Sequence, residues 1–250
     1  SGEFAVPNGP SAYDGVDGTA LAKYSAGLAA QMCLLFGFLA AIDAVLVSFP
    51  SVKVPFVVNV VFLYTFNLKS SLFSILPSSK NEGRKITDKD QGTQESKRNV
   101  PKWTPPGIAF VFGWPLLTFG LRAVTGAMIV QASGGRYATA AIMSLMLHFS
   151  VGNLWNTVSN VERRLGVSVT LLFSLWLTKA FAALQFYKVE PLAGKLLALT
   201  LTWITAAVAL TTRTWQINPD VDTGELEPLV PMRHPKWTTK FRWEPQRIAL

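Results

Sequence analysis

The stretch YSAGLAAQMCLLFGFLAAIDAVLVSF, residues 24–49, decides the fold class of this chain. It contains one charged side chain, Asp43, and its apolar residues surround a helix on every side, whereas a soluble helix shows an apolar stripe. A run of about 20 apolar residues crosses the ~30 Å hydrocarbon layer of a bilayer. We therefore predict a transmembrane helix at residues 24–49.

Five more stretches of similar character follow, at residues 54–76, 107–130, 138–158, 167–187 and 192–214. The stretch at 54–76 becomes polar after Phe66, so it fits either a spanning or an interfacial helix, and we favour spanning. The composition agrees, because 15% of the 250 residues are charged, against about 25% in ordinary soluble domains. The sequence thus predicts an all-α membrane protein.

Polar segments divide the chain into four parts. We expect a polar N-terminal segment at 1–23, one helix at 24–49, a helical bundle at 50–218 with a polar loop at 77–104, and a polar, aromatic tail at 219–250. Trp237, Phe241 and Trp243 interrupt the charges of this tail, which either docks on a partner or lipid headgroups or is solvated. The chain begins at Ser1, which we interpret as processing, and we expect an organelle membrane, thylakoid or mitochondrial.

Basic residues are distributed unequally between the two sides that six spans define. Sixteen Lys and Arg fall on the side of the termini and six on the other, the six being Lys53, Arg122, Arg136, Lys179, Lys188 and Lys195. Because Lys and Arg accumulate on the non-translocated side, we predict that both termini face the cytoplasm, stroma or matrix.

Three further features have structural interpretations. Cys33 is the only cysteine, and we expect it to be packed inside the protein. Asp43 either reaches water or pairs with Lys53, and residues 162–164, Glu-Arg-Arg, are predicted to form a solvated turn that fixes topology.

No enzyme motif is present in the sequence. A phosphate-binding Gly-rich loop, HExxH, a nucleophile elbow and CxxC are all absent. His148 and His234 have no carboxylate at a spacing suited to acid–base catalysis. We expect no enzymatic activity and no nucleotide or nucleic-acid partner.

Tryptophan is frequent, with eight residues, several of them inside the apolar stretches. Trp103-Thr104-Pro105-Pro106, followed by Phe110 and Trp114, resembles the W-x-P-P entry to the second helix of the TspO/MBR family. Trp155, Trp176, Pro191-Leu192-Ala193, Trp203 and Trp215-Gln216-Ile217-Asn218 fall at the spacings expected for the later family motifs. The resemblance covers about residues 102–218.

The chain departs from the family pattern at several positions. His148 and Gly152 stand where Gln and Asn are usual, Leu199-Thr200 replaces a Pro-Tyr pair, and Thr211 replaces a later Asn. The Tyr-containing motif associated with sterols is missing, so the sequence does not support sterol binding.

The resemblance implies a five-helix transmembrane bundle with one additional N-terminal helix. It also implies that a tetrapyrrole such as porphyrin, haem or chlorophyll, or another flat apolar ligand, binds between the helices. The expected ligand-binding residues are Phe110, Trp114, Trp155, Trp203 and His148, with packing as the alternative role of the Trp residues. His148 is also a candidate axial ligand to a tetrapyrrole metal, the alternative being a hydrogen bond to a neighbouring helix.

Two functions fit these observations. The first is binding of such a ligand for sensing, transport or storage. The second is a non-catalytic accessory or scaffold subunit of a larger photosynthetic or respiratory membrane complex, which holds pigments or lipids and meets its partner subunits through the N-terminal helix and C-terminal tail. An enzyme acting on a lipid or pigment ranks last.

Overall fold

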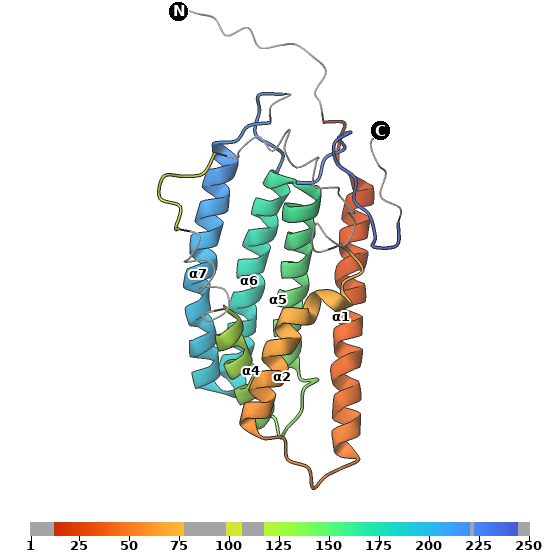
Figure 1. The fold of residues 1–250 in the computed structure, drawn as a ribbon, viewed down its shortest axis with the longest axis vertical. Helices are drawn as coiled ribbons and strands as arrows, with labels where there is room; N and C mark the ends of the chain where they lie inside the picture. The colour runs from red at the N-terminus through yellow and green to blue at the C-terminus, as the bar shows by residue number, and fades with distance from the viewer. Residues whose placement is uncertain (1–12, 78–98, 107–117, 221–222, 245–250) are drawn as a thin grey trace, which may run out of the picture.

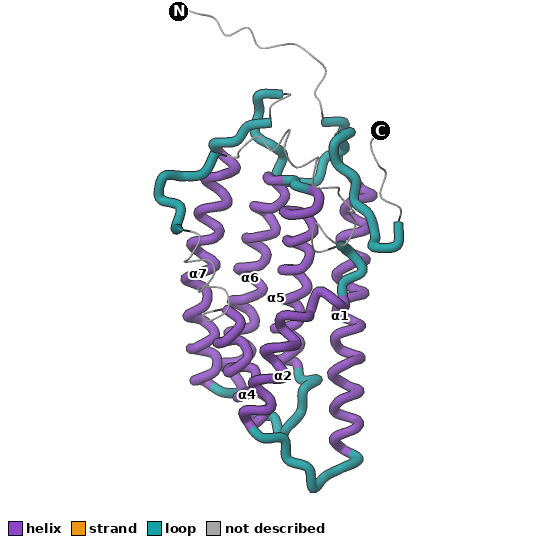
Figure 2. The backbone as a smooth tube through the Cα atoms, in the orientation of Figure 1, coloured by secondary structure: helices purple, strands orange, loops and turns teal. Residues whose placement is uncertain are grey.

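The computed structural model describes residues 13–77, 99–106, 118–220 and 223–244. Apart from one isolated bridge between Val16 and Met232, the regular structure in these ranges is helical (Figure 2). The elements are α1 (Gly18–Val47), α2 (Phe56–Lys69), η1 (Ser70–Phe73), α4 (Leu121–Ala132), α5 (Ala140–Asn156), η5 (Thr157–Glu162), α6 (Leu165–Val189) and α7 (Pro191–Gln216).

The long helices lie side by side along the long axis of the molecule (Figure 1). α6 packs between α5 and α7, α4 packs against both α2 and α7, and α1 lies against α5 and η1. These contacts give the order α2, α4, α7, α6 and α5, with α1 beside α5, and η1 contacts both α2 and α5. The described start of the chain and the described tail lie at the same end of the bundle (Figure 1), where Asp14 N donates to the Arg233 carbonyl oxygen.

Four described helices are long and apolar enough to cross a membrane: Gly18–Val47, Phe56–Phe73, Leu165–Val189 and Pro191–Gln216. As described, α4 and α5 have 12 and 17 residues, and part of the predicted span 107–130 lies outside the described residues. Large apolar side chains such as Phe36 and Leu184 are exposed, while polar Gln31 and Asn59 are buried. This reversal of the soluble pattern confirms an all-α integral membrane protein.

Local sequence signals explain the hairpin between α6 and α7. Glu190 alone separates the two helices, and its side chain accepts a hydrogen bond from Leu192 N at 3.2 Å. Pro191 occupies the first turn of α7, where its missing N–H is not needed. Gly194 then allows close packing, because a Cβ at this position would lie 2.4 Å from the Tyr187 backbone.

At the end of the bundle away from the termini, Asp43 holds the loop between α4 and α5. Its carboxylate accepts hydrogen bonds from Tyr137 N at 2.7 Å and Ala138 N at 2.8 Å. Loop attachment, which the sequence did not suggest, is therefore a role of Asp43. Cys33 is exposed on α1, so the prediction that it is packed inside is wrong; its side chain lies on the outward, apolar face of the helix.

At the end of the bundle near the termini, Arg164 is buried among acidic side chains. Its Nη2 donates to Asp17 Oδ2 at 3.1 Å, and its Nε lies 3.0 Å from Glu162 Oε2, without the alignment of a hydrogen bond. The side chains of Arg164 and Glu162 are 1% and 3% exposed. The prediction of a solvated turn is wrong for these two residues because the C-terminal tail covers them.

The tail contacts the chain itself. Trp237 lies under the Arg164 guanidinium at 5.4 Å, and Phe241 packs on the cluster that contains Tyr24. Glu244 accepts from Lys23 Nζ at 2.6 Å. These contacts attach residues 237–244 to the start of α1, while Trp243 remains 67% exposed.

Candidate functional site

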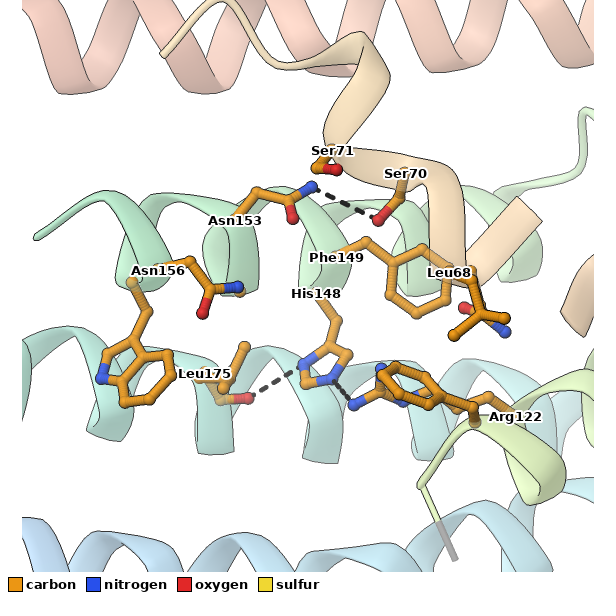
Figure 3. A pocket seen from close by; sticks show the side chains of 13 residues that line it. Leu68, Ser70, Ser71, Arg122, His148, Phe149, Asn153, Asn156 and Leu175 are labelled. Atoms are coloured by element: carbon orange, nitrogen blue, oxygen red, sulfur yellow. Dashed lines mark hydrogen bonds between the residues drawn. The ribbon is translucent and has the colours of Figure 1, made fainter. Parts of the chain in front are cut away.

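A cavity of about 480 Å³ lies between α2 with η1, α4, α5 and α6. Ligand sites in proteins commonly have volumes of about 300–1,000 Å³. The aromatic walls are Phe119, Phe149 and Trp155, and the amide groups are those of Asn67, Asn153 and Asn156. Figure 3 shows side chains from these separate helices around one space.

Trp155 lines this cavity and carries a polar atom with an unmet hydrogen bond. Its Nε1 is buried and has no hydrogen-bond partner among the described residues. An indole N–H in an apolar environment requires an acceptor, so a ligand with an acceptor atom would be stabilised there. Gly152, one of the departures from the family pattern, also lines the cavity, and the absence of a side chain leaves space beside Leu175.

His148 lies at the midpoint of α5 and connects three helices. Its Nδ1 is 3.1 Å from the Leu175 carbonyl oxygen on α6, and its Nε2 is 2.9 Å from Arg122 Nη2 on α4 (Figure 3). A guanidinium can only donate, so Nε2 is the acceptor and the proton is on Nδ1. The imidazole is thereby neutral with both nitrogens engaged.

This geometry bears on the predicted axial ligation. The lone pair that would bind a tetrapyrrole metal already accepts the Arg122 hydrogen bond. Ligation by His148 stays a prediction, and it requires Arg122 to move away from Nε2. The hydrogen bond to a neighbouring helix, which was the alternative role, is present.

Arg122 and Lys179 are two basic residues buried within the bundle. Their residues are 6% and 0% exposed, and no carboxylate among the described residues pairs with either. The Arg122 guanidinium lies over the rings of Phe119 at 5.7 Å and Phe149 at 5.3 Å. These contacts are cation–π interactions, which partly offset the cost of burying the charge.

The positions of Arg122 and Lys179 correct the count of loop charges. Both were assigned to the loops on the side opposite the termini, and both lie inside the bundle. Removing them leaves four basic residues on that side, so the asymmetry that predicts topology becomes stronger.

The structure brings some of the predicted site residues together and not others. Trp155 and His148 line the cavity, whereas Trp203 on α7 does not. Phe110 and Trp114 lie outside the described residues. Sequence reasoning missed Arg122, although a basic residue within a predicted span is a signal for a functional position.

A second cavity, of about 610 Å³, lies at the opposite end of the bundle. It is bordered by Asp43, Lys53, Asn59 and Arg136. None of the predicted ligand-binding residues lines it.

Comparison of the sequence with known proteins identifies a family match over the helices α4 to α7. The profile of the TspO/MBR family matches residues 81–216, which is more than half of the chain and includes α4 to α7. The chain is 27% identical to Protein CrtK of Rhodobacter capsulatus over 120 residues, which cover 48% of this chain and 74% of CrtK. The family match excludes α1, α2 and η1, although α2 and η1 contribute one wall of the first cavity.

Proposed function

Because the chain belongs to the TspO/MBR family, we propose that it binds a flat apolar ligand of the tetrapyrrole type, for sensing, transport or storage, without covalent chemistry. The observation that carries the proposal is the cavity between α2, α4, α5 and α6, with aromatic walls inside a membrane bundle. Rings of Phe149 and Trp155 can stack on a planar ligand at a favourable offset. The unpaired indole N–H of Trp155 supplies a polar contact that orients it.

The size of the cavity and its polar groups support a tetrapyrrole-type ligand. A volume of about 480 Å³ holds a drug-sized molecule, and a few convergent polar groups fix orientation in such sites. Porphyrin, haem and chlorophyll types remain the ligand candidates. A free-base porphyrin needs no axial ligand, so it can bind while His148 keeps its hydrogen bond to Arg122.

A titration of the purified full chain with protoporphyrin tests this function. Quenching of tryptophan fluorescence should saturate at low micromolar ligand, with the ligand's own absorption band as a second readout. Trp155→Leu should weaken binding roughly threefold to tenfold, since an aromatic contact contributes about 0.5–1.5 kcal/mol beyond its buried area. Trp243→Leu is the control, because Trp243 is 67% exposed and distant in sequence from the cavity residues.

A linear response without saturation would contradict ligand binding. Equal affinities of the Trp155 and Trp243 variants would place the ligand elsewhere on the protein.

The second candidate function, an accessory subunit of a larger membrane complex, is favoured by the outer face of α1. This helix carries exposed Leu34 and Phe36, and it lies outside the region that matches the family. Gentle extraction and native mass measurement test the proposal: a partner subunit attached through α1 should be retained, and migration as a monomer would contradict it.

The membrane orientation is also a proposal. The described start of the chain and the described tail share one end of the bundle (Figure 1), and the sequence assigns most of the loop Lys and Arg to that side. This asymmetry supports a cytoplasmic, stromal or matrix location for that end. Accessibility of an introduced cysteine in the 77–104 loop to a membrane-impermeant reagent would test the assignment.

A further inference from the structure

The buried basic residues beside the cavity carry an inference about the ligand's chemistry. Arg122 lines the cavity, and among the described residues its side chain makes a hydrogen bond only to His148. Its Nε is buried without a partner in the same part of the chain. A guanidinium has five N–H donors in a planar fork that fits a carboxylate, so most of its hydrogen-bonding capacity is unused.

Lys179 adds a second basic group close to Arg122. It lies one helical turn after Leu175 on α6, on the same buried face, and the Leu175 carbonyl oxygen accepts from His148 Nδ1. Its Nζ is buried and has no hydrogen-bond partner among the described residues. Two basic side chains therefore share one region of the bundle interior.

A cationic group inside a membrane protein is costly unless an anion or hydrogen-bond acceptors compensate it. The described acidic residues do not supply that anion: Asp43 binds the loop backbone at the far end, and Glu162 is paired with Arg164 near the termini. His148 cannot supply it either, because its imidazole is neutral. Among the described residues, therefore, no carboxylate faces Arg122.

We propose that the cavity recognises an ionised carboxylate on its flat ligand, with Arg122 as the contacting residue and Lys179 as a second basic group nearby. The inference rests on the proposed ligand-binding function and makes it more specific. The ring system packs against Phe149 and Trp155, while the carboxylate meets the free edge of the guanidinium. His148 acts as a positioning residue, since its Nε2 holds one Arg122 nitrogen and fixes the direction of the fork.

The test compares protoporphyrin IX with its dimethyl ester, which keeps the ring and lacks the acid groups. The full chain in detergent should bind the acid at least about tenfold more tightly than the ester, as expected for charge-assisted hydrogen bonds in a buried site. In Arg122→Met this preference should fall close to one, through weaker binding of the acid. Lys188→Met removes an exposed cation from the same helix as Lys179 and should leave the preference unchanged.

The outcomes separate this inference from the proposed function. Saturable and equal binding of acid and ester by the unmodified chain would overturn the carboxylate site and leave ligand binding intact. Failure of both compounds to saturate would overturn the ligand-binding function itself. The ratio of acid to ester affinity, compared between variants, cancels any difference in how the two compounds partition into detergent.

Two further arms complete the experiment. If Arg122→Met does not fold, Lys179→Met should still reduce the acid preference by about threefold or more, and an unchanged preference would contradict the role of Lys179. Equimolar oleate should not displace protoporphyrin IX. Displacement would overturn the assignment of the site to a flat ligand, because the site would then also accept the carboxylate of a fatty acid.

Discussion

Replacement of Arg164 by Gln tests how the chain closes the end of the bundle near its termini. Arg164 lies between the carboxylates of Asp17 and Glu162, at 3.1 Å and 3.0 Å, and its side chain is 1% exposed. Gln has no charge, so the variant leaves Glu162, whose side chain is 3% exposed, without its cation. The Arg164–Glu162 pair should therefore contribute much more to the stability of the fold than a surface salt bridge does.

The expected loss follows from the burial of the Arg164 and Glu162 side chains. Removing one partner of a buried ion pair costs about 3–5 kcal/mol, because the other charge stays buried and uncompensated. For a chain of 250 residues, 1 kcal/mol shifts the unfolding midpoint by about 2–4 °C. Arg164→Gln should therefore lower the midpoint by roughly 6–20 °C.

Thermal unfolding in detergent, followed by circular dichroism, measures the effect. Arg163→Gln is the matched control, since Arg163 is the exposed neighbour and carries the same charge. It should change stability by at most about 0.5 kcal/mol. Adding Glu162→Gln to Arg164→Gln should restore part of the loss, because the orphaned carboxylate is removed. Equal midpoints for the two single variants would refute the reasoning.

Two other predictions concern the α6–α7 hairpin and the tail. Gly194→Ala should destabilise the protein by about 1–3 kcal/mol, because the added Cβ would lie 2.4 Å from the Tyr187 backbone. Gly37→Ala is the control and should not destabilise it, because no atom lies within 4 Å of the added Cβ. Equal unfolding midpoints for the two variants would contradict the close packing. The hydrogen bond from Lys23 holds the pKa of Glu244 below its usual value. This attachment of the tail is therefore complete above the ordinary Glu pKa of about 4.3, and it is lost as the pH falls through the lowered pKa. Protease sensitivity of the tail should rise in that acidic range, and a profile unchanged by Glu244→Gln would show that the carboxylate is not responsible.

The spans were predictable because a membrane helix must satisfy its own backbone hydrogen bonds and remain apolar over its length. Residues 24–49, 167–187 and 192–214 correspond to α1, α6 and α7 within a few residues at most ends. α1 begins earlier than predicted, at Gly18, because the Asp17 side chain accepts from Ala20 N and caps the helix. A helix cap of this kind depends on one side chain, so it cannot be detected from the mean hydropathy of a stretch of residues.

The site was predictable only in part. Trp155 and His148 were recognisable as a Trp within a family motif and a polar residue within a span, and both line the cavity. Trp203 has the same sequence character and lies outside it, since the direction of a side chain depends on how the helix packs. Arg122 was counted with the loop charges although it lies within the predicted span 107–130.

Burial at the terminal end was not predictable from local sequence. Residues 162–164 read as a turn, and the tail that covers them is more than 60 residues later in the chain. Contacts over such separations depend on how the helices pack: Arg164 Nη2 donates to Asp17 Oδ2, so the residues just before α1 and α6 lie side by side. The same long-range packing explains why a tail expected to be either solvated or bound to a partner contacts its own chain.

The most direct test of the central claim is an experimental structure of the full chain with protoporphyrin IX. The ring should lie between α2, α4, α5 and α6, in contact with Phe149 and Trp155, with one carboxylate within hydrogen-bond distance of Arg122. A ring bound on the outer face of α1, or a cavity filled by the chain's own side chains with ligand present in excess, would contradict the account.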